Sequence, residues 1–252
     1  MRLFIDTAKL EDIEWGLKTG AMRGITTNPS LLAKEPKGNY LVHLGKIVEL
    51  IKQHVPLENR KGFSLSVEVF SDEPDEILAQ AREFVEKLQW PALAVKVHID
   101  HRGRDNLVLI NQLSRSGISV NCTACMTVYQ AMTAAAAGAR YVSLLWGRIR
   151  DGGIEEKFAK EREELIASGK LRKEDFDPAV AVKETRILLE RFYPKSKIIA
   201  GSVRTPSDVK DASLAGAHIV TVQPKVLREM FGHFKTDEIV DQFFSDFKAW
   251  SN

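Results

Sequence analysis

Short apolar runs alternate with segments of helical periodicity along almost the whole chain. This alternation is typical of βα units, which build a parallel sheet covered by helices. The runs that we expect to form strands are Arg2–Asp6, Gly24–Thr27, Ser64–Phe70, Ala92–Val97, Ser119–Thr123, Tyr141–Trp146, Lys197–Ala200 and His218–Val222. Eight such strands in 252 residues favour an α/β fold of the (β/α)8 TIM-barrel type, formed as a single domain over residues 1–252.

The helices expected between these strands carry start and stop signals. One helix is predicted to open at Thr7 and close at Gly20, and another to open at Thr205, where a hydroxyl precedes a proline and an early acid. Further helices are expected at Asn39–Gln53, Asp75–Leu88, Glu155–Ser168, Pro178–Tyr193 and Asp237–Trp250.

The last of these, an additional C-terminal helix within residues 236–252, is unusually apolar on one face. Its apolar residues at helical spacing are Ile239, Val240, Phe243, Phe244, Phe247 and Trp250. A stripe of this kind is rarely left in water. We expect the helix to pack on its own barrel or on a neighbouring subunit, and we expect a homo-oligomer.

Composition argues against several classes of function. The 36 basic and 34 acidic residues are well mixed and leave a net charge of +2, which gives no sign of a nucleic-acid partner. Asp6 interrupts the N-terminus before a signal core could form, and no run approaches the ~20 apolar residues of a membrane span. We expect a cytoplasmic protein that contacts no membrane, with Cys122 and Cys125 as reduced, buried thiols.

One lysine stands inside a predicted strand. Lys96 lies in the apolar run Leu93–Val97, and interior strands of parallel sheets rarely admit a charge. In one interpretation Lys96 lies at the end of the strand and extends to a surface carboxylate. In the other its amine is partly desolvated, which favours the neutral, nucleophilic form that condenses with a carbonyl group to a Schiff base.

Polar residues cluster where the predicted strands end, and in a (β/α)8 barrel these positions converge on one site. The set comprises Asp6, Thr26, Asn28, Glu68, Lys96, Asn121, Thr123, Ser143, Arg148, Ser202 and Arg204. Glu68 inside a strand needs a partner, which a lysine on the adjacent strand would supply. Asp6 would otherwise cap a helix, and Asn121 and Thr123 would hold a water or bond to backbone.

The stretch after the seventh strand favours an anion site. Gly201–Arg204 leads into a helix near Pro206, so backbone N–H groups, a hydroxyl and a guanidinium come together. Phosphate binding recurs at this place in barrels. Arg148, after the sixth strand, could reach the same anion, although either arginine would also fit a surface ion pair.

These motifs, taken together, match a known family. The matching residues are Asp6, Gly24–Leu31, Val67–Val69, Val95–Val97, Asn121–Thr123, Gln130–Arg148 and Gly201–Arg204. They resemble the transaldolase family, which includes the small transaldolases and the fructose-6-phosphate aldolases. The resemblance runs in register from the first strand to Pro224, and such an ordered series is more specific than any single motif.

The resemblance implies a (β/α)8 enzyme that uses a Schiff-base lysine and no metal or organic cofactor. It assigns Lys96 as the nucleophile, Glu68 as an acid/base acting through a water held by Thr123, and Asp6 as the proton acceptor in carbon–carbon cleavage. The dihydroxyacetone part of the intermediate would be held by Asn28, Asn121 and Ser143, with Thr26 among the binding residues. The anionic end of the substrate would meet Arg148, Ser202 and Arg204.

Three features refine the resemblance. Glu68 stands where transaldolases have glutamate and fructose-6-phosphate aldolases have glutamine, which favours group transfer. Leu145 replaces an aromatic residue, so the tyrosine that holds a water in the aldolases is missing. The run His98–Arg104 is longer and more charged than the family pattern, which usually has proline after the lysine. It is either a solvated loop or a reader of a different acceptor or anion, such as a sulfonated sugar.

We therefore expect transfer of a dihydroxyacetone unit from an anionic ketose, such as a sugar phosphate, to an aldehyde, as in the pentose phosphate pathway. The nearest alternative is an aldolase that releases free dihydroxyacetone. A second alternative is a noncatalytic barrel that binds a sugar phosphate. The set Asp6, Glu68, Lys96 and Thr123 favours an enzyme, because a binding module has no need of a buried amine.

Overall fold

The computed structural model of the protein describes residues 1–251 and has a closed barrel of eight parallel strands. The strands follow the spatial order β1-β10-β9-β8-β7-β4-β3-β2, and β1 pairs with β10 to close the ring. Their bounds are β1 Arg2–Asp6, β2 Met22–Thr26, β3 Ser64–Glu68, β4 Leu93–His98, β7 Val120–Cys125, β8 Tyr141–Leu145, β9 Lys197–Gly201 and β10 Ile219–Val222. The predicted (β/α)8 TIM-barrel class is confirmed.

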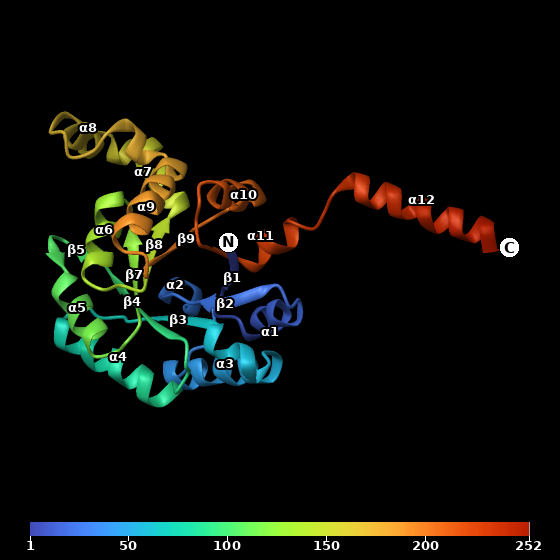
Figure 1. Cartoon of the computed structure of the whole chain (residues 1–252), viewed down its shortest axis with the longest axis horizontal. Helices are drawn as coiled ribbons and strands as arrows, with labels where there is room; N and C mark the ends of the chain where they lie inside the picture. Colours follow the sequence, from blue (N-terminus) through green and yellow to red (C-terminus); the bar gives the residue numbers. More distant parts are fainter. Residues whose placement is uncertain (252) are drawn as a thin grey trace.

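Helices surround the barrel (Figure 1). Their bounds are α1 Leu10–Lys18, α2 Pro29–Leu32, α3 Tyr40–His54, α4 Pro74–Leu88, α5 Leu107–Arg115, α6 Val128–Ala136, α7 Trp146–Ile154, α8 Ala159–Ala167, α9 Pro178–Phe192, α10 Pro206–Leu214, α11 Pro224–Glu229 and α12 Phe234–Ser251. Asn39 and Thr205 cap α3 and α10 with their side chains, in agreement with the sequence signals.

Two predicted helices differ from the structure. The hydroxyl of Thr7 accepts from the amide of Lys9 in a local turn, and α1 begins only at Leu10. The helix expected at Glu155–Ser168 is divided into a short 3-10 turn, Glu156–Phe158, and α8.

A small hairpin after β4 was not predicted. It consists of β5, Asp100–His101, and β6, Arg104–Asp105, joined by a two-residue turn. Arg102 and Gly103 have φ values of 53° and 78°, and a type I′ turn requires positive φ at both of its central residues. Strands of two residues are too short to leave an alternating pattern in the sequence.

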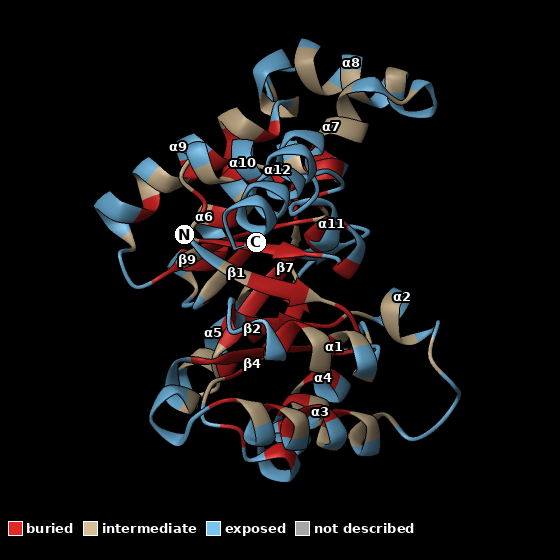
Figure 2. Ribbon diagram, turned by 90° about the vertical axis from the view of Figure 1, so that its right-hand side faces the viewer, coloured by how far each residue is buried: buried red, intermediate tan, exposed pale blue. Residues whose placement is uncertain are grey.

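The two faces of the barrel wall differ in chemistry, because side chains alternate across a strand. The face toward the helices is apolar and fully buried, as at Ile25, Val95, Val142 and Val220. Figure 2 shows these strands as the buried centre of the protein. On the inner face polar side chains gather toward the carboxyl ends of the strands, and those that are buried are Thr26, Ser66, Lys96, Asn121, Thr123, Ser143 and Thr221.

The amino end of the barrel interior is filled by a separate apolar cluster. Phe4, Ile199 and Ile219 form it, with Tyr141 packed against them. Gly24 on β2 leaves room for the ring of Phe4, since a Cβ added there would lie 2.6 Å from Phe4 Cζ. The interior is therefore apolar and packed at one end, and polar at the end where the expected site residues lie.

The C-terminal helix α12 extends away from the barrel (Figure 1). Every residue of α12 is exposed, including Phe243, Phe247 and Trp250, the last with 81% of its surface accessible. The apolar stripe expected from the sequence is present, and it lies in solvent in the single chain. Separately, no helix within residues 1–251 has the length and apolar character that crossing a bilayer requires.

The close approach of β2 to Phe4 gives a stability prediction. We expect Gly24→Ala to lower the free energy of unfolding by about 1–3 kcal/mol, because the new methyl group overpacks the barrel interior. Gly45→Ala on α3 is the matched control: nothing lies within 4 Å of its added Cβ, and alanine is the better helix former. Urea denaturation measures both variants, and equal midpoints would contradict the proposed packing.

Candidate active site

Lys96 lies on the inner face of β4 with only 7% of its surface exposed. Its Nζ donates to Glu68 Oε2 at 2.6 Å and to the carbonyl oxygen of Thr27 at 2.8 Å. Lys96 and Glu68 are direct partners in the register of β4 and β3, so strand pairing itself brings the two charges together. The partner of Lys96 is thus an inner-face carboxylate of the adjacent strand, and the lysine does not extend to the protein surface.

Asp6, at the end of β1, belongs to a chain of hydrogen bonds with two threonines. Thr26 Oγ1 donates to Asp6 Oδ1 at 2.6 Å, and the hydroxyls of Thr26 and Thr221 are 2.6 Å apart, so Thr221 donates to Thr26. Burial raises the pKa of Asp6 above its usual value, although the charge of Lys96 and the Thr26 hydrogen bond act in the opposite direction. Asp6 is a carboxylate of increased basicity, and it caps no helix, since Lys9 is the N-cap of α1.

A chain of buried side chains crosses the barrel beside Lys96. Ser143 Oγ donates to Asn121 Oδ1 at 2.7 Å, and Asn121 Nδ2 donates to Ser66 Oγ at 3.2 Å. The chain links β8, β7 and β3 and fixes the orientation of the Asn121 amide. Thr123 follows Asn121 on the same face of β7 and is also buried. The next residue, Ala124, has a positive φ of 58° where the register of β7 with β8 shifts, and bulges of this kind re-aim side chains near active sites.

A cavity of about 1440 Å³ opens at this end of the barrel, and its wall includes Asp6, Glu68 and Tyr40. The Tyr40 hydroxyl donates to the carbonyl oxygen of Glu68 at 3.3 Å. Burial raises the pKa of Tyr40 to about 12, so this group is a neutral donor at ordinary pH. Asn28 directly follows Thr27, whose carbonyl oxygen binds Lys96. The Asn28 Oδ1 accepts from the amide of Leu31 and caps the short helix α2.

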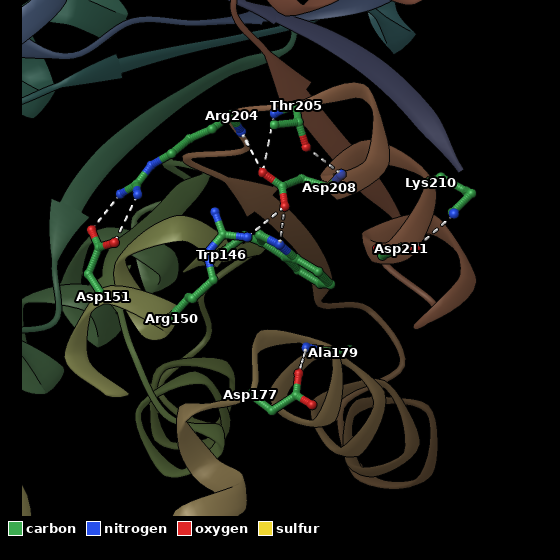
Figure 3. A network of polar contacts seen from close by, with 10 residues as sticks. All are labelled: Trp146, Arg150, Asp151, Asp177, Ala179, Arg204, Thr205, Asp208, Lys210 and Asp211. Carbon is green, nitrogen blue, oxygen red and sulfur yellow. Dashed lines mark hydrogen bonds and ion pairs between the residues drawn. The ribbon is translucent and has the colours of Figure 1, made fainter. Parts of the chain in front are cut away.

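The predicted anion-binding residues form a second group, after β8 and β9. Both guanidinium Nη atoms of Arg204 bond to the carboxylate of Asp151, as Figure 3 shows, and Arg148 Nη1 lies 3.5 Å from the same carboxylate. Ser202 adopts a left-handed conformation with φ 58°, and its carbonyl oxygen accepts from the amide of Gly147. A Cβ at Gly147 would meet that oxygen at 2.5 Å and the Arg204 side chain at 2.8 Å, so only glycine fits here.

Asp208 supports this second group from below (Figure 3). It accepts from the Arg204 amide at 2.8 Å, from Arg150 at 2.9 Å and from the Trp146 indole at 3.1 Å. Burial acts to raise the pKa of Asp208, but these hydrogen bonds and the Arg150 charge hold it below its usual value. Asp208 is therefore an ionised carboxylate that fixes the turn carrying Arg204.

The two groups also contain five residues that were not expected from the sequence: Thr27, Tyr40, Asp151, Asp208 and Thr221. Asp151 was detectable, because it stands three residues after Arg148 on a helix, a spacing at which side chains meet. Thr221 was detectable as a polar residue inside an apolar run. Tyr40 carried no signal beyond its place at the start of a helix, and Thr27 contributes a backbone oxygen that any residue would supply.

The two cysteines of the chain form no disulfide bond within residues 1–251. Cys122 and Cys125 are buried free thiols with their sulfur atoms 3.8 Å apart. Across residues 1–251, no three His, Cys, Asp or Glu side chains gather as ligands of a metal ion.

Comparison with known proteins identifies the family. A family described as Transaldolase/Fructose-6-phosphate aldolase matches residues 3–252. A protein of Dehalococcoides mccartyi named "Probable transaldolase" is 32% identical over 250 residues, covering 99% of both chains. A "Probable transaldolase" of Clostridium botulinum is 33% identical over 249 residues, covering 98% of this chain and 97% of its own.

Among solved structures, the thiamine phosphate pyrophosphorylase of Pyrococcus furiosus superposes with a TM-score of 0.54 over 91% of this chain and 93% of its own. At 11% identity, this likeness concerns the barrel fold alone. The match over residues 3–252, the full-length relatives and the closed barrel agree, and the chain belongs to the transaldolase/fructose-6-phosphate aldolase family.

Proposed function

We propose that this protein transfers a dihydroxyacetone unit from an anionic ketose to an aldehyde acceptor through a Schiff base on Lys96. The observation that carries the proposal is the buried amine of Lys96, which lies 2.6 Å from Glu68 Oε2 and interacts electrostatically with the carboxylate of Asp6. A buried amine between two carboxylates suits covalent catalysis on a carbonyl group. Relatives named as probable transaldolases at about 30% identity support the choice of reaction.

The first step is condensation of Lys96 with the ketone at C2 of the donor. The lysine passes a proton to Glu68, its hydrogen-bond partner, and the neutral amine adds to the carbonyl carbon. The carbinolamine then loses water as Glu68 returns a proton to the departing hydroxyl, directly or through a water beside Thr123. The product is an iminium ion at Lys96.

The second step is cleavage of the C3–C4 bond. Asp6 takes the proton of the C4 hydroxyl, the aldehyde leaves, and the bonding electrons move to the iminium nitrogen to form an enamine. Burial makes Asp6 a stronger base than an ordinary aspartate. When the enamine forms, the positive charge at Lys96 disappears, so protonated Asp6 is stabilised at the stage where it holds the proton. Attack of the enamine on an acceptor aldehyde reverses these steps.

Binding of the donor would use both groups of the site. The oriented amide of Asn121, with Ser143 behind it, would hold the hydroxyls of the dihydroxyacetone unit, together with Asn28 and Thr26. Arg148, Ser202 and Arg204 would bind the anionic end of the sugar. Since Asp151 already pairs with both arginines, a substrate anion would have to displace this carboxylate or share the arginines with it.

Two other functions make different predictions. An aldolase would release free dihydroxyacetone without an acceptor aldehyde, whereas a transferase turns over only when an acceptor is present. A noncatalytic sugar-phosphate-binding barrel would show neither exchange nor covalent labelling. Glu68 supports transfer through the resemblance alone, since transaldolases have glutamate at this position and fructose-6-phosphate aldolases have glutamine.

We also propose that the protein is a homo-oligomer joined by α12. The apolar residues Ile239, Phe243, Phe247 and Trp250 lie on one face of a helix that is exposed over its whole length. Most of the stability of a helix in a protein comes from packing of its apolar face, so α12 needs a packing partner. Every copy of the chain carries the same exposed helix α12. Two copies can therefore each supply an apolar helix face to the other, and we take a second copy as the partner.

Covalent labelling tests the nucleophile. Incubation with fructose 6-phosphate and borohydride should reduce the Schiff base and add the mass of the sugar at Lys96, and Lys96→Met should abolish the adduct. Lys46→Met, which alters an exposed lysine of the cavity wall, is the matched control and should label normally. Mass spectrometry of the digested protein locates the adduct. Absence of an adduct with every ketose phosphate tried would refute the mechanism.

The role of Asp6 predicts opposite effects on activity and stability. Asp6→Asn should lower kcat/KM by about 10²–10⁴-fold, since the general base is lost. The pKa of Asp6 is raised on folding, so its ionisation costs stability as the pH rises above the unfolded value of 3.8 and through the folded value. Asp6→Asn should therefore unfold at higher urea concentration at pH 7, and this gain should vanish well below pH 3.8.

The control for this measurement is Asp241→Asn on exposed α12, which should leave the unfolding free energy within about 0.5 kcal/mol of wild type. A destabilised Asp6→Asn protein at pH 7 would mean that Asp6 makes a net favourable contribution to the fold, contrary to the cause assigned to its pKa.

The assembly proposal is tested by charge on the apolar face of α12. The double variant Phe243→Glu, Phe247→Glu should have a lower mass than wild type in light scattering at micromolar concentration, because it buries two carboxylates in the interface. Asp241→Asn on the same helix should keep the wild-type mass. A monomeric wild-type protein, or an unchanged mass in the double variant, would rule out this interface.

A further inference from the structure

His98 ends β4 on the same inner face as Lys96, because the two residues are two positions apart on one strand. The strand rise places it roughly 7 Å further toward the mouth of the barrel. Its partner in the register is Thr123 on β7, just as Asn121 is the partner of Lys96. His98 therefore lies one inner-face position beyond Lys96 on β4, toward the mouth of the barrel.

The backbone of His98 is held firmly, and its imidazole is not. Asn106 Nδ2 donates to the His98 carbonyl oxygen at 2.9 Å, and the amide of Ile99 donates to the Thr123 carbonyl oxygen at 3.1 Å. The half-buried imidazole meets the ring of His101 edge-on, with centroids 6.2 Å apart. It forms no hydrogen bond with any other of residues 1–251. Its two nitrogen atoms are therefore available to a ligand.

The unexpected hairpin holds this arrangement in place. His101 on β5 bonds to Asp72 at 2.9 Å, and Arg104 on β6 donates to the carbonyl oxygen of Asp72 and to Glu73. These contacts tie the loop after β4 to the loop after β3, the strand that carries Glu68. The His101 ring that meets His98 is thus held in place by contacts with the loop after β3.

His98 offers both a donor and an acceptor at neutral pH. Burial lowers the pKa of His98, His101 adds to this effect, and the facing carboxylates of Glu68, Asp72 and Asp100 oppose it without cancelling it. A neutral imidazole has one N–H and one lone pair. This pair suits a hydroxyl group, which both donates and accepts, better than an anion.

We propose that His98 is a specificity-determining residue that hydrogen-bonds hydroxyl groups of the ketose beyond the three carbons of the transferred unit. The inference rests on the proposed function, because it takes C2 of the sugar to be bound at Lys96. A ketose anchored there and extending to the mouth of the barrel passes His98 with its distal carbons. The three-carbon ketone dihydroxyacetone ends before that level and makes no such contact.

The test compares two donors on matched variants. His98→Phe keeps a ring against His101 but removes both hydrogen-bonding atoms. It should lower kcat/KM for fructose 6-phosphate about tenfold, equivalent to about 1.4 kcal/mol. Borohydride labelling of Lys96 by dihydroxyacetone should stay within twofold of wild type. His98→Asn, which retains a donor and an acceptor, should recover part of the loss. His101→Phe, which keeps a ring beside His98 but loses the bond to Asp72, is the control for packing of the rim and should lose clearly less than His98→Phe with fructose 6-phosphate.

The outcomes separate this inference from the proposed function. If dihydroxyacetone fails to label wild-type Lys96, the Schiff-base mechanism itself fails. If wild type is labelled and His98→Phe loses equally with both donors, or with neither, His98 does not read the distal hydroxyls and the inference is wrong. A loss in His101→Phe as large as that in His98→Phe would assign the effect to packing of the rim and would also overturn it.

Discussion

The site depends on one ion pair in the barrel interior, between Lys96 Nζ and Glu68 Oε2 at 2.6 Å. Taking two charges out of water costs several kcal/mol for each ion, and their attraction repays this only with good geometry and further hydrogen bonds. The register of β3 with β4 supplies the geometry, and the carbonyl oxygen of Thr27 supplies a further bond to the amine. An apolar pair would fill the same space at lower cost, so the pair is better explained by chemistry than by stability.

The barrel accommodates this polar centre by dividing its interior into two parts. Phe4, Ile199 and Ile219 pack the amino end, while the wall facing the helices is apolar throughout. The polar groups at the carboxyl end can then be satisfied by one another, as in the series Ser143, Asn121 and Ser66. The stabilising core and the polar groups of the site occupy separate faces and separate ends of the same strands, so the cost of burying these polar groups does not disrupt the packing of the core.

Charge at the anion end is balanced within the chain. Arg204 and Arg148 share Asp151, and Asp208 fixes the turn that presents Arg204 (Figure 3). The arginines therefore do not stand as free cations, and in the proposed function an anionic substrate would gain only the difference between its own contacts and those with Asp151. Such an exchange would make recognition sensitive to the shape and position of the anion as well as to its charge.

The sequence by itself determined the eight strands, the alternation that turns Lys96 and Glu68 to one face, and the apolar stripe of the C-terminal helix. These features are local, because side-chain period and strand parity depend only on neighbouring residues. The family could also be named from motifs that keep their order along the chain.

Only the tertiary structure decided which of these polar residues meet. The Thr221 hydroxyl reaches Thr26 across 195 residues of sequence because β10 pairs with β1 and closes the ring. Three other features likewise depend on where segments lie in space. They are the pairing of Asp151 with Arg204, the hydrogen bonds between the hairpin and Asp72, and the departure of α12 from the barrel. Periodicity carries no information about these arrangements, since each depends on which elements tertiary folding brings together or leaves apart.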